Sequence, residues 1–475
     1  MTVRPYLVNG EWRTGDGTFE VKSPFDGSAV AELGVPTESD VEEAAATAAS
    51  TFAESRHLPV HARADALDHI SRRLAESVDE NAELIAREGG KPLKWARVEA
   101  TRAISTFRWA SEIIRHGEDE VMRLDTEASL GSRIGLLRRF PIGPVLGITP
   151  FNFPLNLVAH KVAPSLAVGA PIVVKPASAT PMGALRLAEL FAETDLPKGM
   201  YQVLPVSSKV ADGMARDERY RKISFTGSAE IGWYLKGLDP KKRVTLELGG
   251  NAGVIVHSDA DLDHAAARIA FGGYYQAGQS CISVQRVLVQ SEVYEDFAAR
   301  LVKEVENLKV GDPMDPTVDV GPVIQPQEVD RIDSWVREAV SQGAEILIGG
   351  KADSPFYSPT LLSHVNPDMK VCREEIFGPV VTISPYETFE DALASVNDSR
   401  FGLQAGVFTN DINRAFEAHR TLEVGGVIIN DQSAFRADQM PYGGSKESGF
   451  GREGLRFAME EMTEQRIMVL SNVPL

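Results

Sequence analysis

Residues 145–175 read VLGITPFNFPLNLVAHKVAPSLAVGAPIVVK, and this stretch indicates the architecture of the chain. It contains two short apolar runs, 145–148 and 172–175, on either side of a helical pattern over 155–167. Two short runs joined by a helix-length segment are typical of parallel strands with a crossover helix. The stretch therefore predicts a βαβ unit.

The same alternation continues towards the carboxyl terminus. After this unit, a helix is predicted over 183–193 and strands over 201–204, 222–225 and 244–248. A second alternating region is predicted to contain strands at 254–256, 284–289, 380–383, 405–408 and 427–429, and helices at 262–275 and 292–306. We therefore expect two α/β domains, each with a parallel sheet covered by helices on both faces. Ligands of such sheets bind beyond the carboxyl ends of the strands.

Helix signals precede these regions. Ser39 and Glu42 have the spacing of a capping box and predict the start of an Ala-rich helix that ends near Ala53. Two more helices are predicted over 60–88 and 95–115, the first of them ending at a Gly-Gly pair before a proline. Three helices are therefore predicted between residues 39 and 115.

Two distant segments have a strand-like pattern outside both alternations. They are residues 121–139 and the apolar run 466–470 near the carboxyl terminus. If these segments pair, their outer edge offers unpaired backbone groups to another strand. We therefore expect a small β arm through which the chain forms a homodimer or homotetramer.

Composition excludes several classes of partner. The 475 residues carry a formal net charge of −18, a field that repels nucleic acid and anionic membrane surfaces. Two cysteines do not make a disulfide framework, and the first residues, MTVRPYLVNG, lack the apolar core of a signal peptide. No apolar run is long enough to span a bilayer, and no metal site is predicted. A reduced, cytoplasmic compartment is the expectation.

Cys281 is one of the two cysteines and lies in a small, polar turn, Gly278-Gln279-Ser280-Cys281. Backbone donors in such a turn can lower the pKa of a thiol, and the thiolate is the nucleophilic form. The competing interpretation is a buried structural cysteine, which is the commoner case and the one that we favour for Cys372. On local sequence alone, both interpretations of Cys281 stay open.

Polar residues end other predicted strands of the first sheet. Glu247 ends a β-rich run with Gly249 and Gly250 close behind it, so its carboxylate can reach a water in a cleft. Lys175 ends another strand, and Gly227-Ser228 joins a strand to a helix, where a hydroxyl can contact a phosphate. The alternative interpretations are a paired surface glutamate for Glu247, a solvent-facing lysine for Lys175 and a plain N-cap for Ser228.

These residues belong to seven ordered motifs that resemble the aldehyde dehydrogenase family over nearly the whole chain. The motifs are Thr149-Pro150-Phe151-Asn152-Phe153-Pro154, Lys175-Pro176, Phe225-Thr226-Gly227-Ser228, Leu246-Glu247-Leu248-Gly249-Gly250, Gly278-Gln279-Ser280-Cys281, Glu375-Ile376-Phe377-Gly378-Pro379, and Pro441-Tyr442-Gly443-Gly444 with Lys446 and Ser448-Gly449. The resemblance implies a Rossmann-type dinucleotide-binding domain over 1–118 and 141–248, a catalytic α/β domain over 249–455, and a β oligomerisation arm over 119–140 and 456–475. It also implies the hydrolytic, NAD(P)-dependent branch, which oxidises aldehydes to carboxylic acids.

The resemblance implies a role for each matching residue. Cys281 attacks the aldehyde carbonyl, and Asn152 holds the developing oxyanion together with the Cys281 backbone N–H. The thiohemiacetal then gives hydride to the nicotinamide, and Glu247 activates the water that hydrolyses the thioester. The residues implied in cofactor binding are Ile148, Pro150, Phe151, Lys175, Ser178, Gly227, Ser228, Glu375 and Phe377.

Ser178 departs from the family pattern, because many NAD-preferring relatives have glutamate three residues after the lysine. A neutral hydroxyl leaves room for a 2′-phosphate, with Lys175 as a counter-charge. We therefore expect NADP to be accepted, and a serine that tolerates both NAD and NADP is the alternative.

The substrate pocket implied by alignment through Asn152 is polar. Its expected members are Phe153, Asn156, Leu157, His160 and Arg436. Buried polar groups need partners, so we expect a small hydroxylated or anionic aldehyde of the lactaldehyde, glyceraldehyde 3-phosphate or semialdehyde type. Arg436 either clamps an anion or forms a salt bridge with Asp431 or Asp438.

Two other functions stay open at this point. A CoA-acylating semialdehyde dehydrogenase passes the acyl group to CoA, but that branch commonly lacks the base that Glu247 matches. A relative that has lost its catalytic activity and has a structural or binding role usually lacks the nucleophile or the oxyanion group. This chain keeps both, as Cys281 and Asn152. The leading hypothesis is therefore a hydrolytic aldehyde dehydrogenase.

Overall fold

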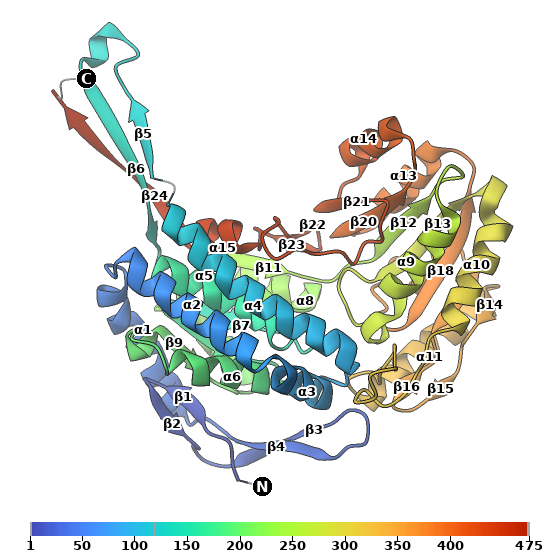
Figure 1. The fold of residues 1–475 in the computed structure, drawn as a ribbon, viewed down its shortest axis with the longest axis horizontal. Coiled ribbons are helices and arrows are strands. Elements are labelled where there is room, and N and C mark those ends of the chain that lie inside the picture. Colours follow the sequence, from blue (N-terminus) through green and yellow to red (C-terminus); the bar gives the residue numbers. More distant parts are fainter. Residues whose placement is uncertain (1, 118, 473–475) are drawn as a thin grey trace.

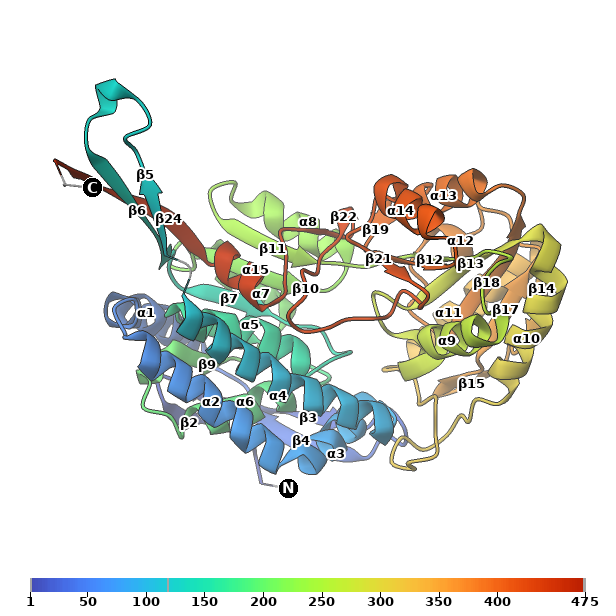
Figure 2. The same cartoon turned by 45° about the horizontal axis from the view of Figure 1, so that its top comes forward.

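The computed structural model describes residues 2–117 and 119–472. Met1 and Glu118 of the predicted dinucleotide-binding domain and residues 473–475 of the predicted arm lie outside the described residues. Figure 1 shows two α/β bodies side by side and an arm of strands that projects from the first body. The turned view in Figure 2 shows the same projection of the arm. Each body has its own sheet and its own buried core, which confirms the predicted α/β fold.

The first body is built on an eight-stranded sheet with the order β2-β1-β9-β8-β7-β10-β11-β23. Its strands are β1 (Tyr6–Val8), β2 (Glu11–Arg13), β7 (Val145–Ile148), β8 (Ile172–Lys175), β9 (Tyr201–Val203), β10 (Lys222–Thr226), β11 (Arg243–Glu247) and β23 (Gly449–Phe450). The five strands from β9 to β11 are parallel, and the outer strands pair antiparallel. The predicted βαβ unit lies at the centre, where α5 (Asn156–Val168) connects β7 to β8.

Helices pack around this sheet. They are α1 (Glu38–Ser55), α2 (Val60–Glu76), α3 (Val78–Gly89), α4 (Leu93–His116), α5, α6 (Met182–Phe191), α7 (Ser208–Arg216), α8 (Ala229–Leu238) and α15 (Leu455–Glu461). Every residue of α5 except Val168 is buried, because α4 packs across the face of α5 that points away from the sheet (Figure 1). The helix predicted over 60–88 is two helices, since the chain leaves helical geometry at Ser77, where φ is −120°.

The start of α1 differs from the prediction. Its capping box is formed by Thr37 and Asp40, not by Ser39 and Glu42. Asp40 is buried and also accepts a hydrogen bond from the Tyr6 hydroxyl at 2.5 Å. A partner from a distant strand therefore selects one of two overlapping capping patterns.

The second body is built on a seven-stranded sheet with the order β14-β17-β18-β13-β12-β20-β21, in which every pair except β14–β17 is parallel. Its strands are β12 (Ala252–Val256), β13 (Val284–Gln290), β14 (Glu345–Ile348), β17 (Thr360–Ser363), β18 (Val380–Tyr386), β20 (Gln404–Phe408) and β21 (Gly426–Ile429). Its helices are α9 (Leu262–Tyr274), α10 (Tyr294–Glu306), α11 (Pro326–Ser341), α12 (Lys370–Arg373), α13 (Phe389–Asn397) and α14 (Ile412–Thr421). Val254 and Val256 of β12 join the core under α9 to α11, and Ile255 joins a separate core under α13 and α14. Helices thus cover both faces, as the apolar runs predict.

Short strand pairs complete the two bodies. They are β3 (Thr18–Lys22) with β4 (Ala29–Gly34), β15 (Ala352–Asp353) with β16 (Phe356–Tyr357), and β19 (Phe401–Gly402) with β22 (Ser445–Lys446). Across residues 2–117 and 119–472, no helix combines the length and the apolar character needed to cross a membrane.

The arm is a three-stranded antiparallel sheet of β5 (Glu120–Arg123), β6 (Arg133–Pro141) and β24 (Thr463–Ser471). The predicted pairing of 121–139 with 466–470 is confirmed by this register. The arm begins later than the predicted position 456, because α15 precedes it. Leu455 and Met459 of α15 are buried in the core of the first body.

Candidate active site

Glu247 is the last residue of β11 at the carboxyl edge of the first sheet, beside Thr226 of β10. Its side chain is buried, and neither carboxylate oxygen has a hydrogen-bond partner among the described residues. Burial, together with the nearby charge of Glu453, raises the pKa of Glu247 well above its usual value. Buried polar atoms are normally satisfied, so an unpaired carboxyl group here is typical of a functional site.

Cys281 follows a stretch of unusual backbone. Gln276, Ala277 and Gly278 have φ values of 56°, 54° and 67°, in the left-handed region. The first two are not glycine, so surrounding contacts must stabilise their conformation. The Gln276 side chain makes one such contact by donating to the Asn152 carbonyl oxygen at 2.6 Å. A Cβ atom at Gly278 would lie 2.1 Å from a backbone carbonyl oxygen, so only glycine fits there.

Two cavities meet at Cys281 and Glu247. One has a volume of about 690 Å³ and follows the carboxyl edge of the first sheet. The other has a volume of about 300 Å³ and is lined by residues of α4, α5 and α9. Thr226, Glu247 and Cys281 line both cavities, so groups bound in either one reach the thiol and the carboxyl group.

The larger cavity contains all the residues that the resemblance implies in cofactor binding. They are Ile148, Pro150, Phe151, Lys175, Ser178, Gly227, Ser228, Glu375 and Phe377, and Asn152 joins them. Burial lowers the pKa of Lys175. Among the described residues its ammonium group has no hydrogen bond or salt bridge. Ser228 caps α8 without a side-chain capping hydrogen bond, which leaves its hydroxyl available at a helix N-terminus. These free donors fit an anionic dinucleotide such as NAD or NADP.

Glu375 and Phe377 approach this cavity from the second body. Glu375 accepts a hydrogen bond from the Gly250 N–H at 3.0 Å, and burial raises its pKa to about 7. A Cβ atom at Gly249 would lie 2.3 Å from the Glu375 carboxylate, so glycine makes room for this group. Phe377 has a left-handed φ of 44°, and its ring packs edge-on against Phe151, with 5.9 Å between ring centres.

The smaller cavity combines aromatic walls with charged groups. Its lining includes Trp95, Phe153, Leu157, Phe271, Tyr275, Ile282, Phe435 and Tyr442, and the polar residues Glu99, Arg102, Asn156, Arg268, Gln276, Gln432 and Arg436. The expected substrate residues Phe153, Asn156, Leu157 and Arg436 are thus brought together. The arginines on α4 and α9 were not indicated by the sequence pattern, because an arginine on a helix normally faces solvent.

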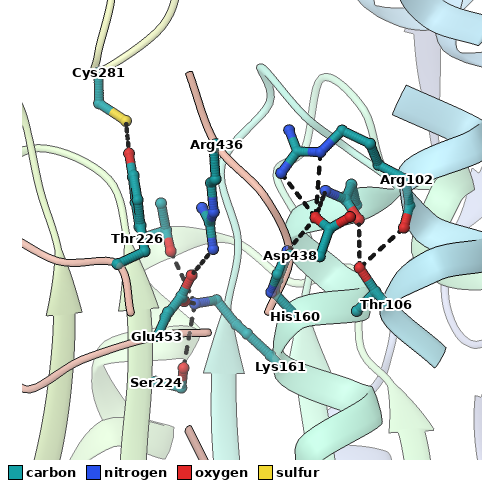
Figure 3. Close-up of polar contacts among 12 residues, drawn as sticks. Arg102, Thr106, His160, Lys161, Ser224, Thr226, Cys281, Arg436, Asp438 and Glu453 are labelled. Atoms are coloured by element: carbon teal, nitrogen blue, oxygen red, sulfur yellow. Dashed lines mark hydrogen bonds and ion pairs between the residues drawn. The ribbon is translucent and has the colours of Figure 1, made fainter. Parts of the chain in front are cut away.

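His160 is the exception among the expected substrate residues, because it does not line this cavity. Its side chain is buried outside the cavity lining, with Nε2 3.0 Å from Asp438. Burial lowers the pKa of His160 to about 4, so its ring is neutral. Asp438 also binds Arg102 at 2.8 Å. Figure 3 shows His160 and Arg102 directed at Asp438 from two sides. We therefore correct the expectation, since His160 contacts Asp438 and not the cavity.

Arg436 forms a salt bridge, but with neither expected partner. Its guanidinium lies 3.1 Å from Glu453, and its side chain is only 6% exposed. Asp431 pairs instead with an arginine of α9 at 2.7 Å, and Asp438 pairs with Arg102 of α4. Helices from distant parts of the chain reach the two aspartates, so closeness to Arg436 in sequence does not decide the pairing.

Glu453 connects Arg436 to a second buried cation. Lys161 of α5 lies 2.9 Å from Glu453 and also donates to Thr226 at 2.8 Å (Figure 3). Burial opposes the charge of Glu453, but Lys161 and Arg436 outweigh it and lower its pKa to about 2. The sequence pattern indicated neither residue, although a lysine inside an otherwise apolar helix was an available signal.

The comparisons with known proteins agree with this geometry. The model of the aldehyde dehydrogenase family matches residues 12–468. The chain belongs to the aldehyde dehydrogenase family. A 3-sulfolactaldehyde dehydrogenase from Priestia megaterium is 43% identical over 465 residues, which cover 98% of this chain and 97% of that protein.

Two solved structures resemble this dehydrogenase over all or nearly all of its length. Aldehyde dehydrogenase 21 from Physcomitrella patens, in complex with the reaction product succinate, has a TM-score of 0.97 at 40% identity and covers 100% of this chain and 99% of its own. A glyceraldehyde-3-phosphate dehydrogenase from Methanocaldococcus jannaschii, complexed with NADP, has a TM-score of 0.92 at 37% identity. The match covers 96% of this chain and 100% of that protein. The protein is thus an NAD(P)-dependent aldehyde dehydrogenase, and the predicted enzyme class is confirmed.

The dehydrogenase has one more contact at Cys281. The Tyr442 hydroxyl lies 3.1 Å from the Cys281 Sγ atom, and the Arg436 guanidinium lies 3.7 Å from the centre of the Tyr442 ring. The motif Pro441-Tyr442-Gly443-Gly444 marked the position, but no local pattern indicated a contact with the thiol.

Proposed function

We propose that the dehydrogenase oxidises a small anionic or hydroxylated aldehyde to its carboxylic acid, with Cys281 as nucleophile, Glu247 as general base and Asn152 as oxyanion donor. The observation that carries this proposal is the meeting of two cavities at Cys281 and Glu247. The larger cavity, of about 690 Å³, suits a dinucleotide, and the smaller one, of about 300 Å³, suits a small aldehyde. A thiol at their junction reaches both molecules.

NAD or NADP, when bound in the larger cavity, supplies the hydride acceptor. Lys175 and Glu375 would hold its riboses, and Ser228 at the N-terminus of α8 would hold its pyrophosphate. Phe377, whose ring contacts Phe151 in the lining of this cavity, would pack beside the nicotinamide.

The residues of the chain carry out the other steps. The Cys281 thiolate forms a bond to the carbonyl carbon, and the carbonyl electron pair moves to the oxygen, where the Asn152 amide stabilises it. After the oxidation, Glu247 takes a proton from water, and the resulting hydroxide displaces Cys281 from the thioester as the acid forms. The absence of any described partner on its oxygens leaves the Glu247 carboxylate free for that water.

Replacing Asn152 with alanine should lower kcat by about two to three orders of magnitude, the usual cost of losing one oxyanion donor. Its amide nitrogen already donates to the Gln279 carbonyl oxygen at 3.0 Å, which orients the side chain beside Cys281. Steady-state kinetics with saturating cofactor measures the effect. A kcat within threefold of the wild type would remove Asn152 from the mechanism.

The charges of the smaller cavity support the proposed substrate class. Arg102 and Arg268 line it and are 22% and 34% exposed, and Arg436 has an Nε without a described partner. Carboxylate partners fix these guanidinium groups but leave further N–H donors for a sulfonate, phosphate, carboxylate or hydroxyl group. The relatives named for 3-sulfolactaldehyde and glyceraldehyde 3-phosphate, and the one solved with succinate, favour the same chemistry.

An aldehyde panel tests this substrate class. We expect 3-sulfolactaldehyde, glyceraldehyde 3-phosphate and succinic semialdehyde to have higher kcat/KM than acetaldehyde and benzaldehyde. Arg102→Gln and Arg268→Gln should each lower the anionic-to-neutral ratio of kcat/KM about tenfold or more, since a hydrogen bond to a charged group is lost. Arg108→Gln is a matched control on α4, because Arg108 is 58% exposed and lies outside both cavities. An unchanged ratio in both variants would exclude an anion site here.

Ser178 gives a separate prediction about the cofactor. We propose that NADP is accepted because Ser178 places no negative charge at this part of the cavity, and Lys175 lies in the same lining. Ser178→Glu should lower kcat/KM for NADP at least about tenfold relative to NAD, through repulsion of the 2′-phosphate. Equal effects on the two cofactors would show that Ser178 does not face that phosphate.

We also propose that the enzyme is a cytoplasmic homodimer or homotetramer assembled through the arm. The strand β24 exposes Ile467, Met468, Val469 and Leu470 at 50%, 51%, 47% and 38%. Apolar side chains on an edge sheet are typical of a subunit contact. Sedimentation equilibrium should give two or four times the chain mass of 51.7 kDa, and a monomer would contradict the proposal.

A further inference from the structure

We propose that the Tyr442 hydroxyl is a further catalytic group of the dehydrogenase, which donates a hydrogen bond to the Cys281 thiolate, and that Arg436 positions the Tyr442 ring. The proposal rests on the role of Cys281 as nucleophile. It goes beyond that role because it assigns the group that stabilises the reactive form of the thiol.

The geometry at the sulfur carries the proposal. The Tyr442 side chain is buried, and its hydroxyl lies 3.1 Å from the Cys281 Sγ atom. Within the described residues, this sulfur is the one hydrogen-bond partner of the hydroxyl. Tyr442 lines the same cavity as Cys281, so the contact lies where the aldehyde would arrive.

The direction of the hydrogen bond follows from the two protonation states. A thiolate has no proton, so it can only accept. Burial raises the pKa of the Tyr442 phenol well above its usual value, so Tyr442 stays protonated and can only donate to that thiolate. A hydrogen bond to an ionised acceptor is about twice as strong as a neutral one.

The charges around Cys281 show why such a donor matters. The pKa of the Cys281 thiol is raised to about 12, because burial, Glu375 and Glu247 raise it by more than Tyr442 and Arg436 lower it. The titratable and charged groups that face the thiol are Glu247 on β11, Tyr275 after α9, Glu375 after α12, and Arg436 and Tyr442 in the segment after β21. Tyr442 and Arg436 are thus the groups of this set that favour the thiolate.

Arg436 is placed to hold the ring of Tyr442. Its guanidinium lies 3.7 Å from the ring centre, and Glu453 fixes it from the other side at 3.1 Å. A cation on the face of a phenol attracts the ring and makes its O–H group a stronger donor. This gives the buried Arg436 a role other than the anion clamp expected from the sequence.

The chemical step is balanced without proton loss from Tyr442. The thiol proton leaves to water, and the Tyr442 O–H bonds to the negative sulfur. The sulfur then forms the bond to the carbonyl carbon, and the carbonyl electron pair moves to the oxygen. Tyr442 keeps its proton throughout, so no further reactant is needed.

The decisive variant is Tyr442→Phe, which removes the hydroxyl and keeps the ring beneath Arg436. The thiol should become less acidic by about one to two pH units, as expected for loss of a hydrogen bond to a charged group. Because a more basic thiolate is also more nucleophilic, the net loss in rate should be about 3- to 15-fold. This loss should occur both in iodoacetamide alkylation of Cys281 between pH 6 and about 10 and in the burst of reduced cofactor.

Two substitutions serve as controls for the alkylation experiment. Tyr201→Phe removes a buried tyrosine hydroxyl that donates to the Ala184 carbonyl oxygen at 2.9 Å and lies outside both cavities, so its alkylation profile should stay within twofold of the wild type. Incorporation of a fluorotyrosine at position 442 keeps the ring and makes the hydroxyl more acidic, so alkylation should become faster. That measurement remains informative if Tyr442→Phe folds poorly.

The role of Arg436 is tested by a double-mutant cycle. Arg436→Gln should slow alkylation less in the Tyr442→Phe background than in the wild type, because part of its effect passes through the hydroxyl. Equal slowing in both backgrounds would exclude the positioning role.

The outcomes separate this proposal from the proposed function. Unchanged alkylation and burst rates in Tyr442→Phe, together with an inactive Cys281→Ser enzyme, would overturn the role of Tyr442 alone. An active Cys281→Ser enzyme would instead overturn the nucleophile on which the role depends.

Discussion

Cys281→Ser should lower kcat for aldehyde oxidation by about four to six orders of magnitude, the scale seen when a nucleophile that acts as part of a unit is removed. A serine hydroxyl ionises far less readily than a thiol, so the substitution leaves almost no nucleophile at this position. The rate of cofactor reduction with a saturating aldehyde measures the loss.

Cys372→Ser is the matched control for this substitution. Cys372 lies in α12, is 8% exposed and lines neither cavity at the active site. Its replacement should leave kcat within about twofold. If Cys281→Ser kept more than about a hundredth of the wild-type rate, the covalent thioester route would have to be abandoned.

Glu247→Gln should separate the two halves of the reaction. An amide cannot take a proton from water, so thioester hydrolysis should slow by about two to four orders of magnitude. Acylation does not need that proton transfer, so rapid mixing should still show a burst of reduced cofactor close to one per active site. Loss of the burst together with the steady-state rate would contradict a role confined to hydrolysis.

The pH dependence gives a second readout of Glu247. Burial and the charge of Glu453 raise the pKa of its carboxyl group well above the usual value, and only the ionised form is a base. Hydrolysis in the wild type should therefore speed up as the pH rises towards and through this raised pKa, and slow down as the pH falls. The Glu247→Gln variant should lose this dependence, and a persisting profile would assign it to another group.

Local patterns in the sequence were enough for much of the fold. The apolar runs of β7, β8, β10 and β11 and the crossover helix α5 were predicted within about one residue of the observed boundaries. Lys175 and Glu247 were each predicted at the end of a strand of the first sheet, and parallel strands of one sheet end at the same edge. The cavity along this edge contains both residues.

Other features could not be predicted from neighbouring residues. Two overlapping capping patterns preceded α1, and burial of Asp40 against Tyr6 selected one of them. The break at Ser77 interrupts a continuous helical pattern, so periodicity gave no sign of it.

The features of the active site also fall into two groups, those indicated by short sequence motifs and those set by tertiary packing. The nucleophile candidate, the carboxyl group and the cofactor residues occur in short motifs, because each depends on its own turn or strand end. Other contacts depend on which distant segments pack together. They are the salt bridge of Arg436 with Glu453, the burial of His160 against Asp438 outside the cavity, and the contact of Tyr442 with Cys281. A buried charge pairs with the nearest opposite charge in space, and the packing of α4, α5 and the segment after β21 sets that distance.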